Sequence, residues 1–280
     1  MVILSGLLRS SRIGDEKGLY QVWRAAFGDT DAYIDGFFSR LYTPGMAAVY
    51  EIQDQIVSAA YALPLGKLLI PGSKPQNCAV TYALGTLPEY RSRGIGGKVA
   101  KMAADMCTEN GVGVLCPAEP SLFGYYEKFG YRPLFSAERC TFQAKPVKNG
   151  VLRKETAQSY SRMREMLLSD TVHIAYSEKI MAYQEYLCLD TGGGLFSVNF
   201  NGAVCVASAQ ILPGGQLFLE ELLCPEDLKI PVASMVANRL GLTRILAMRP
   251  ANESAGSTPV AMLLPSGQSP KNGWFGFSFG

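Results

Sequence analysis

The sequence predicts an α/β (α+β) fold in which helices cover a β-sheet, and it predicts two such domains. Segments with apolar residues at helical spacing alternate with short, β-rich apolar segments along the chain. The chain has 280 residues, of which 48% are hydrophobic, which is enough for two buried cores. A polar, turn-rich stretch at 145–150 separates the two halves, so we expect domains at 1–144 and 151–280.

The first half is expected to run helix, helix, strand, strand, strand, helix, strand, helix, strand. The helix at 94–110 has the strongest pattern, because Val99, Met102 and Met106 fall on one face. Gly111 is expected to be the C′ residue of that helix, and Gly85 indicates a bulge or a close backbone approach in the third strand. The expected helices span 15–27, 29–41, 94–110 and 120–129, and the expected strands span 47–52, 56–63, 79–87, 112–116 and 131–144.

The second half repeats this order of elements roughly, although not the residues themselves. Asn201-Gly202 and Gly214-Gly215 are expected hairpin turns. The last strand is expected to alternate, with the phenylalanines at 275, 277 and 279 on one buried face. The expected helices span 155–168, 177–189 and 225–240, and the expected strands span 195–200, 203–212, 216–223, 244–248, 260–264 and 274–279.

Composition excludes several classes of protein. A net charge of +2 is too small to favour nucleic acid or an anionic membrane as the partner. The seven cysteines include no C-x-x-C pair and there is one histidine, so neither a metal site nor a disulfide framework is expected. Because the sequence shows no long apolar run and no secretory signal, we expect a cytoplasmic protein.

The segment from Leu84 to Lys98 carries the clearest chemical signal. It reads as a strand, a basic glycine-rich loop and the start of the strong helix, with the pattern Arg91-x-x-Gly94-x-Gly96. Glycines allow tight turns, and the first turn of a helix has backbone N–H groups without partners and a partial positive charge. The segment therefore predicts a site for a phosphate or pyrophosphate, although it matches neither a Walker A nor a G-x-G-x-x-G motif.

Two motifs in this half resemble those of the GNAT superfamily of N-acetyltransferases. Leu84–Gly97 is similar to the acetyl-CoA motif of that superfamily, and Phe123–Tyr131 (Phe-Gly-Tyr-Tyr-Glu-Lys-Phe-Gly-Tyr) is similar to its next motif. They stand in the same order, at similar spacing and on the same kinds of element. The resemblance covers residues 15–143 and implies an acetyltransferase-type mixed central sheet, with acetyl-CoA as co-substrate.

The resemblance also implies which residues contact acetyl-CoA. The backbone of Leu84, Gly85 and Thr86 is expected to face the acetyl and pantetheine groups. Ser121 and Leu122 are expected beside the pantetheine and the thioester. The residues expected around the pyrophosphate are Ser92, Arg93, Gly94, Ile95, Gly96 and Gly97.

Tyr126 matches the tyrosine that serves as general acid in this superfamily. When an amine attacks a thioester, negative charge develops on the carbonyl oxygen, and a backbone N–H near Gly85 could stabilise it. The departing thiolate needs a proton, which a phenol at hydrogen-bond distance can donate. The alternatives for this position are a packing tyrosine or a role for the adjacent Tyr125.

Several groups are candidates for the base that takes the proton of the attacking amine. A closer resemblance, carried by Pro88–Gly96 and the two-part chain, is to the enhanced intracellular survival (aminoglycoside-type) acetyltransferases. In that group the final carboxylate reaches the active site, which implies Gly280 here, although those chains are longer, have an extra domain and usually end in a bulkier residue. The glutamates that are alternatives, each also readable as a surface carboxylate, are Glu51, Glu119, Glu220 and Glu221.

The second half of the chain lacks the glycine-rich loop of the expected acetyl-CoA site. Its corresponding junction, Leu222–Ile230, has no glycine loop and places Glu226 and Asp227 where a phosphate would bind. We therefore expect a degenerate acetyltransferase-like domain that walls the acceptor site. The expected reaction is direct transfer of an acetyl group from acetyl-CoA to a primary amine of a small molecule or peptide. The alternatives are a catalytically silent CoA-binding sensor or interaction protein, and a transferase of longer acyl groups; the acceptor and the oligomeric state stay open.

Overall fold

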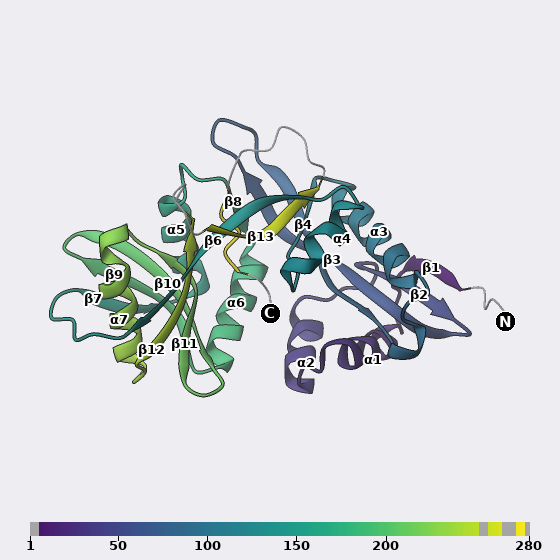
Figure 1. The fold of residues 1–280 in the computed structure, drawn as a ribbon, viewed down its shortest axis with the longest axis horizontal. Helices are drawn as coiled ribbons and strands as arrows, with labels where there is room; N and C mark the ends of the chain where they lie inside the picture. Colours follow the sequence, from purple (N-terminus) through teal and green to yellow (C-terminus); the bar gives the residue numbers. More distant parts are fainter. Residues whose placement is uncertain (1–5, 252–256, 265–272, 278–280) are drawn as a thin grey trace. The chain divides into compact units, whose positions relative to one another are not determined.

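The structure is a computed structural model that describes residues 6–251, 257–264 and 273–277 (Figure 1). The chain forms two compact units. The first contains the described residues up to Leu65, Gln76–Arg132 and the end of the last strand from Met262. The second contains Gly66–Pro75, Pro133–Ala261 and the described residues after 268. The sequence-based division at 145–150 differs from this clustering, because Pro133 and the residues after it group with the second unit.

The first unit is built on a mixed sheet with the strand order β1-β2-β3-β4-β5-β13. Antiparallel pairs join β1 to β2 and β2 to β3, whereas β4 and β5 pair in parallel. The end of β13 continues the sheet antiparallel to β5. The strands are β1 (Leu7–Ser10), β2 (Ala47–Ile52), β3 (Gln55–Leu69), β4 (Gln76–Thr86), β5 (Val112–Leu115) and β13 (Ser257–Leu264).

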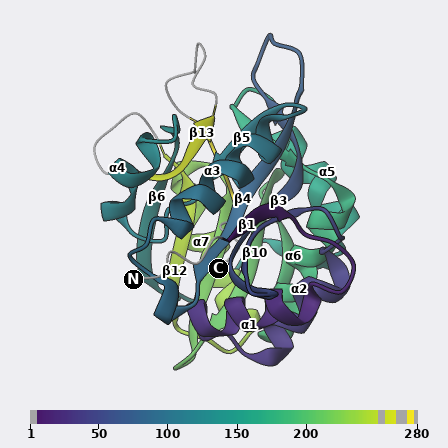
Figure 2. The ribbon, with the colours of Figure 1, turned by 90° about the vertical axis from the view of Figure 1, so that its right-hand side faces the viewer.

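Helices cover both faces of this sheet (Figure 2). On one face, α1 buries Leu19, Val22 and Trp23. On the other face, α3 buries Val99 and Ala103, on the apolar side that the sequence predicts. The helices are α1 (Glu16–Phe27), α2 (Asp31–Arg40), α3 (Ile95–Thr108) and α4 (Phe123–Glu127), with single 3₁₀ turns η1 (Pro88–Tyr90) and η2 (Pro120–Leu122) before α3 and α4.

Two glycines of this unit are required by close packing. A Cβ atom on Gly111 would lie 2.1 Å from the carbonyl oxygen of Asn77. Helix α3 ends at Thr108 with Glu109 as its C-cap residue, so Gly111 lies one position beyond the C′ place that the sequence predicts. A Cβ atom on Gly85 would lie 2.8 Å from the Cβ atom of Ala26 in α1, which confirms the expected close approach.

The second unit has a sheet with the order β6-β12-β11-β10-β9-β7. Here β11 and β12 pair in parallel, and the succession β9, β10, β11, α7, β12 parallels β2, β3, β4, α3, β5 in the first unit. A short strand, β8, pairs with Gly66–Leu69 at the end of β3. The strands are β6 (Arg132–Gln143), β7 (Val151–Glu155), β8 (His173–Tyr176), β9 (Gly194–Phe200), β10 (Ala203–Leu212), β11 (Gln216–Leu223) and β12 (Arg244–Pro250).

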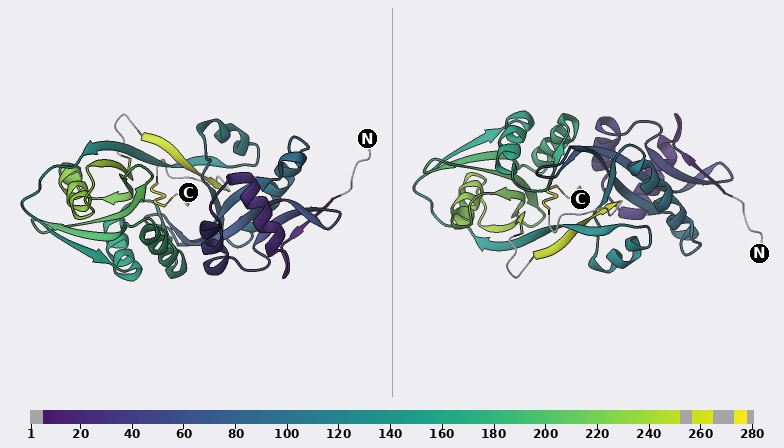
Figure 3. Two further views of the ribbon diagram at one scale, coloured as in Figure 1. Left: turned by 90° about the horizontal axis from the view of Figure 1, so that it is seen from below. Right: turned by 90° about the horizontal axis from the view of Figure 1, so that it is seen from above.

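The helices of the second unit lie on two sides of its strands (Figure 3). In β10, Cys205, Ala207 and Ala209 belong to the apolar cluster under α7. On the other side, α5 and α6 contact β9 and β10. The helices are α5 (Ala157–Leu167), α6 (Glu178–Asp190) and α7 (Lys229–Arg239), the last preceded by the 3₁₀ turn η3 (Glu226–Leu228). No helix in the described ranges is both long and apolar enough to cross a membrane.

Three short strands are missing from the sequence prediction, and one predicted strand is wrong. The missing strands, β1, β7 and β8, have four or five residues each, too few to show a period. The strand expected at 274–279 is not formed in its described part, where Gly273 and Trp274 make only isolated bridges. Trp274, Phe275 and Phe277 are all buried, so the side chains do not alternate between two faces. Phe279 lies outside the described residues.

A buried ion pair holds this C-terminal segment within the second unit. Nε of Arg164 donates to both carboxylate oxygens of Glu221, at 2.9 and 3.0 Å, and both side chains are fully buried. Tyr160 donates to the same carboxylate at 2.9 Å, and the indole N–H of Trp274 donates to it as well. The hydroxyl of Tyr176 donates to the carbonyl of Phe275. Glu221, one of the candidate bases, is therefore occupied by structural hydrogen bonds.

We predict that Glu221→Gln lowers the free energy of unfolding by about 3–5 kcal/mol, because the buried Arg164 loses its fully buried counter-ion and keeps only the partly exposed Glu165. Urea unfolding followed by tryptophan fluorescence measures this change. The matched control is Glu226→Gln, since the side chain of Glu226 is 55% exposed and pairs with Lys229 and Arg249. That change should cost less than about 1 kcal/mol. Equal effects of the two substitutions would contradict the assignment.

Candidate active site

The parallel strands β4 and β5 separate within the first unit. Their ladder joins Cys78–Val80 to Val112–Val114 and goes no further, although β4 continues to Thr86. Past the ladder, Ala83 has a φ of +48°, a conformation that a residue with a side chain rarely adopts. The irregular point of the strand is thus Ala83, two residues before the glycine that the sequence indicated. Backbone groups that leave a ladder in this way can pair with an extended ligand.

The end of β4 is fixed by a serine that the sequence analysis did not identify. The buried hydroxyl of Ser58, in β3, donates to the carbonyl oxygen of Gly85 at 2.8 Å. The same hydroxyl lies 2.9 Å from Oγ1 of Thr86. Since backbone groups of successive strand residues point to opposite sides, a carbonyl of Gly85 that faces β3 leaves the backbone groups of Leu84 and Thr86 facing away from β3. Of the three residues expected to face the acetyl and pantetheine groups, Gly85 and Thr86 both have a carbonyl oxygen that already accepts a side-chain hydrogen bond, from Ser58 and Arg91 respectively.

The loop after β4 presents backbone N–H groups at the start of α3. Ser92 and Gly94 have φ values of +60° and +75°. Gly94 is the N-cap residue of α3, no side chain caps the helix, and its first turn contains no acidic residue. The N–H groups of Ile95, Gly96 and Gly97 therefore have no partner from a capping side chain, and the helix dipole adds positive potential there. A Cβ atom on Gly94 would meet nothing within 4 Å, so the loop is open to a ligand.

Two arginines of the loop stabilise its conformation as well as adding charge. Nε of Arg91 donates to the carbonyl oxygen of Thr86 at 3.0 Å, which ties the loop to the end of β4. The guanidinium of Arg93 donates to the carbonyl of Glu89 at 2.8 Å and lies 5.4 Å from the ring centroid of Tyr90. The positive charge that the sequence predicts around the loop is therefore held on a fixed backbone.

Helix α4 packs against the first turn of α3. A Cβ atom on Gly97 would lie 3.7 Å from the hydroxyl of Tyr125 and 3.8 Å from the ring of Phe129, so glycine permits this packing. On the strand side, a Cβ atom on Gly96 would lie 3.3 Å from Oγ1 of Thr86. The fold thus brings the end of β4, the loop and the start of α3 together with α4, which lies about 40 residues further along the chain.

Tyr126, the expected general acid, lies on the side of α4 that packs on a small apolar cluster. The cluster is formed by Ala104, Leu115, Tyr131 and Met262. Burial raises the pKa of Tyr126 to about 12, because the phenolate is poorly solvated there. The phenol therefore keeps its proton across the physiological range.

The 3₁₀ turn η2 places Ser121 and Leu122 immediately before α4. Ser121 is exposed, and its hydroxyl donates to the carboxylate of Glu119 at 3.3 Å. Glu119 is thus at the surface beside two of the residues expected to contact the pantetheine.

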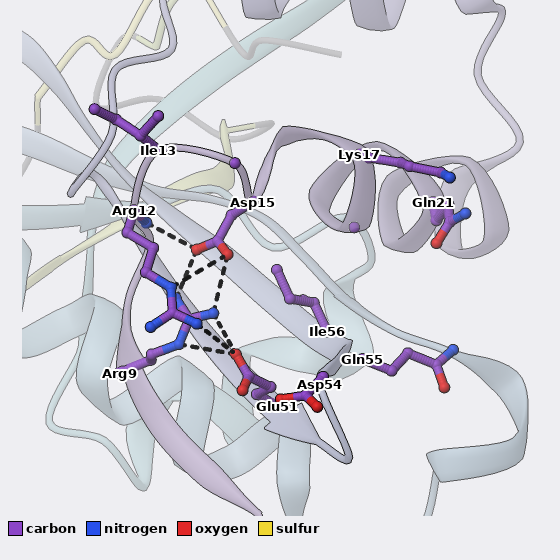
Figure 4. Close-up of a pocket in the computed structure, with 12 residues that line it drawn as sticks. Arg9, Arg12, Ile13, Asp15, Lys17, Gln21, Glu51, Asp54, Gln55 and Ile56 are labelled. Carbon is purple, nitrogen blue, oxygen red and sulfur yellow. Dashed lines mark hydrogen bonds and ion pairs between the residues drawn. The ribbon is translucent and has the colours of Figure 1, made fainter.

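Glu51 and Glu220, two of the other candidate bases, are engaged with neighbouring side chains. Glu51 accepts hydrogen bonds from Arg9, which also binds Asp15 through two nitrogens, at 2.6 and 2.9 Å. Figure 4 shows these three residues and Arg12 on one wall of a pocket of about 450 Å³ beside the start of α1. Glu220 is 3% exposed and accepts a hydrogen bond from Gln210 at 3.1 Å.

Gly280, the candidate base implied by the closer resemblance, lies outside the described residues. Among the described residues, no cluster of histidine, cysteine and carboxylate side chains is arranged to hold a metal ion.

Several known structures share this fold. A GCN5-related N-acetyltransferase from Kribbella flavida has a TM-score of 0.65 at 17% identity, over 92% of this chain and 70% of that one. Eis1 from Mycobacterium abscessus has a TM-score of 0.63 at 16% identity, over 92% and 73% of the two chains. A tandem GNAT protein from the clavulanic acid biosynthesis pathway has a TM-score of 0.54 at 12% identity, over 95% and 100%. At such identities the likeness shows the fold, including a second acetyltransferase-like domain.

Sequence comparison finds a family model that matches the first part of the chain. No curated protein sequence matches the chain. The family model described as an acetyltransferase (GNAT) domain matches residues 8–134, which include the strand end, the loop and α4. Residues 8–134 of this chain are therefore similar to the acetyltransferase (GNAT) domain family.

Proposed function

We propose that the first unit transfers an acetyl group from acetyl-CoA to a primary amine by direct attack of the amine. The match of residues 8–134 to the acetyltransferase (GNAT) domain model supports an acyl-transferring enzyme. The observation that carries the proposal is the uncapped first turn of α3, which follows a left-handed loop and lies beside the free end of β4. An extended arm with a diphosphate at one end fits this arrangement. The arm can form hydrogen bonds with the backbone of Leu84 and Thr86, while the diphosphate oxygens accept hydrogen bonds from the N–H groups in the first turn of α3.

The residues of the unit have distinct parts in the proposed reaction. Bound acetyl-CoA supplies the acetyl group as a thioester. The backbone N–H of Leu84 stabilises the negative charge that develops on the thioester oxygen as the C–N bond forms. Tyr126 donates its phenolic proton to the sulfur as the C–S bond breaks, and it regains a proton from solvent. The proton of the amine passes to a base, for which the candidates are the carboxylate of Gly280 that the closer resemblance implies and the exposed carboxylate of Glu119, since Glu51, Glu220 and Glu221 are engaged with neighbouring side chains.

Two alternative functions can be distinguished from the proposed one by measuring acetyl-CoA binding and acyl transfer to amines. A CoA-binding sensor or interaction protein binds acetyl-CoA but transfers nothing to a panel of small amines and peptides. A transferase of longer acyl groups transfers them in preference to acetyl. The acceptor of the proposed reaction is a small-molecule or peptide amine. Assays of the same panel of amines would identify which acceptor is used.

We expect Gly94→Glu to weaken acetyl-CoA binding at least tenfold, which is about 1.4 kcal/mol. The substitution places a carboxylate at the start of α3, where it repels the diphosphate and competes with it for N–H groups. Isothermal titration calorimetry measures the dissociation constant. Gly202→Glu is the matched control, because Gly202 has a φ of +88° and open space around it but lies in a hairpin of the second unit. Undiminished binding to Gly94→Glu, or no binding to the unchanged protein, would refute the cofactor site.

Tyr126→Phe is expected to lower kcat by about 10²–10⁴-fold while the KM for acetyl-CoA stays within about threefold, since only proton donation is lost. Steady-state assays with the best amine of the panel test this. Tyr125→Phe serves as the control, because its hydroxyl lies near Gly97 on the same short helix. Equal losses in the two variants would assign the effect to packing of α4.

The pH profile provides a separate test of the same tyrosine. With the pKa of Tyr126 raised to about 12 by burial, its phenol stays protonated as the pH rises from 7 to 10. We expect kcat to show no loss over this range, because deprotonation of the acid begins only above it. A descending limb near pH 10 that disappears in Tyr126→Phe would show that the phenol ionises normally.

A further inference from the structure

A second pocket of the first unit lies beside the start of α1. It has a volume of about 450 Å³ and is formed by the loop after β1, the first two turns of α1 and the hairpin between β2 and β3. Figure 4 shows its polar side chains on two sides, with Ile56 between them. Gly18 leaves room for this isoleucine, because a Cβ atom at Gly18 would lie 3.1 Å from Cδ1 of Ile56.

One side of the pocket is a closely connected network of charged side chains. Arg9 donates to both carboxylate oxygens of Asp15, at 2.6 and 2.9 Å, and to Oε2 of Glu51 at 3.0 Å. The three side chains are only 9–13% exposed. The hydrogen bonds from Arg9 lower the pKa of Asp15, so this carboxyl stays ionised. With two carboxylates for one guanidinium, the network carries an excess of negative charge.

Arg12 stands beside this network, and its guanidinium makes no hydrogen bond to any described residue. Its nitrogens lie 4.0 Å from Oδ1 of Asp15 and 3.7 Å from Oε2 of Glu51, which is too long for hydrogen bonds. The side chain of Arg12 is 66% exposed, so its N–H groups are available to a ligand. Within the described part of the chain, Glu51 contacts both arginines through Oε2 alone, so its Oε1 atom is available as well.

Two further charged side chains line the pocket, and neither is paired with a described residue. Asp54 is exposed in the turn between β2 and β3, next to Glu51 in Figure 4. Lys17 extends from α1 on the opposite side, together with the amides of Gln21 and Gln55. The pocket thus offers two cations at its two sides and carboxylate oxygens between them. A complementary ligand carries two anionic groups and one cationic group.

We propose that this pocket binds an acidic α-amino acid, for which L-glutamate is the probe. The α-carboxylate accepts hydrogen bonds from the guanidinium of Arg12, in the paired geometry that arginine offers to carboxylates. The α-ammonium donates to Asp54 and to Oε1 of Glu51. The side-chain carboxylate extends over Ile56 to Lys17. A simple anion would leave the carboxylates of the pocket without a partner, and a simple amine would leave Arg12 without one.

The bound amino acid is a ligand distinct from the acceptor of the proposed reaction. Lys17 lies nine residues before Ala26, the residue of α1 that packs against Gly85 at the end of β4. Nine residues of α-helix span about 13 Å, so an amine at the first turn of α1 is too far from Leu84 to attack an acetyl group there. Binding at this pocket therefore does not depend on the proposed function.

Isothermal titration calorimetry on the full chain tests the site with L-glutamate and two ligands that each lack one group. Glutarate lacks the ammonium, and 4-aminobutyrate lacks the α-carboxylate. We expect each to bind the unchanged protein at least about tenfold more weakly than L-glutamate. In Arg12→Gln the difference between L-glutamate and 4-aminobutyrate should fall below about twofold, because the partner of the α-carboxylate is gone. In Asp54→Asn the difference between L-glutamate and glutarate should fall below about threefold, since Glu51 remains.

Both substitutions should leave the fold intact, and circular dichroism verifies this. The guanidinium of Arg12 has no hydrogen bond to a described residue, and asparagine tolerates the φ of +62° at Asp54. The matched controls are Arg162→Gln and Asp170→Asn, which change the same charges at exposed positions of the second unit. They should leave the affinity for L-glutamate within about twofold of that of the unchanged protein.

Several results would overturn the proposal. If L-glutamate does not bind at millimolar concentrations, the pocket is not an amino-acid site. Equal binding of glutarate and L-glutamate to the unchanged protein would show a site for anions, in which the ammonium has no partner. An affinity for L-glutamate that is the same in Arg12→Gln would place the ligand elsewhere on the chain. Equal losses in the control variants would make the effect one of net charge.

Discussion

The separation of β4 from β5 after Val80 is the constraint from which the candidate site follows. A strand that leaves its partner exposes backbone N–H and C=O groups, which are costly to leave unpaired when buried. In this protein the departure is fixed by the positive φ of Ala83 and by the hydrogen bond from Ser58 to Gly85. The opening is therefore a stable feature of the folded chain, and a ligand that supplies an extended backbone-like arm completes the hydrogen bonds that β5 does not make.

The second unit uses the same topology to a different end. Its parallel ladder joins Leu217–Leu219 to Ile245–Ala247 and also stops after three pairs. The residues that follow in β11 include Glu221, whose carboxylate is buried with Arg164 and the indole of Trp274. A buried ion pair of this kind contributes little net stability but is costly to break, so it fixes one arrangement of the C-terminal segment.

Charge at the helix terminus distinguishes the two units further. In the first unit, Gly94 precedes α3 and no carboxylate lies in the first turn. In the second, Glu226 precedes α7 and pairs with Lys229 and Arg249. A carboxylate already occupies the place of an external anion there, which supports the proposal that only the first unit binds CoA. One fold can thus carry a ligand site or a structural ion pair, depending on a few residues at one junction.

Elements whose signals are local could be predicted from the amino-acid sequence alone. The glycine loop, α3 and α4 follow from neighbouring residues, because helical spacing and glycine positions act over a few residues, and most helices and strands were predictable for the same reason. The role of Ser58, which is 27 residues from Gly85 in the chain, depends on the folding of β3 beside β4. The irregularity at Ala83 was likewise not predictable, because its residue type gives no sign of a positive φ. The same holds for Trp274–Phe277, which reads as a strand but is held by Glu221 and Tyr176, far away in the chain. Contacts between distant segments set these conformations, and no local pattern records them.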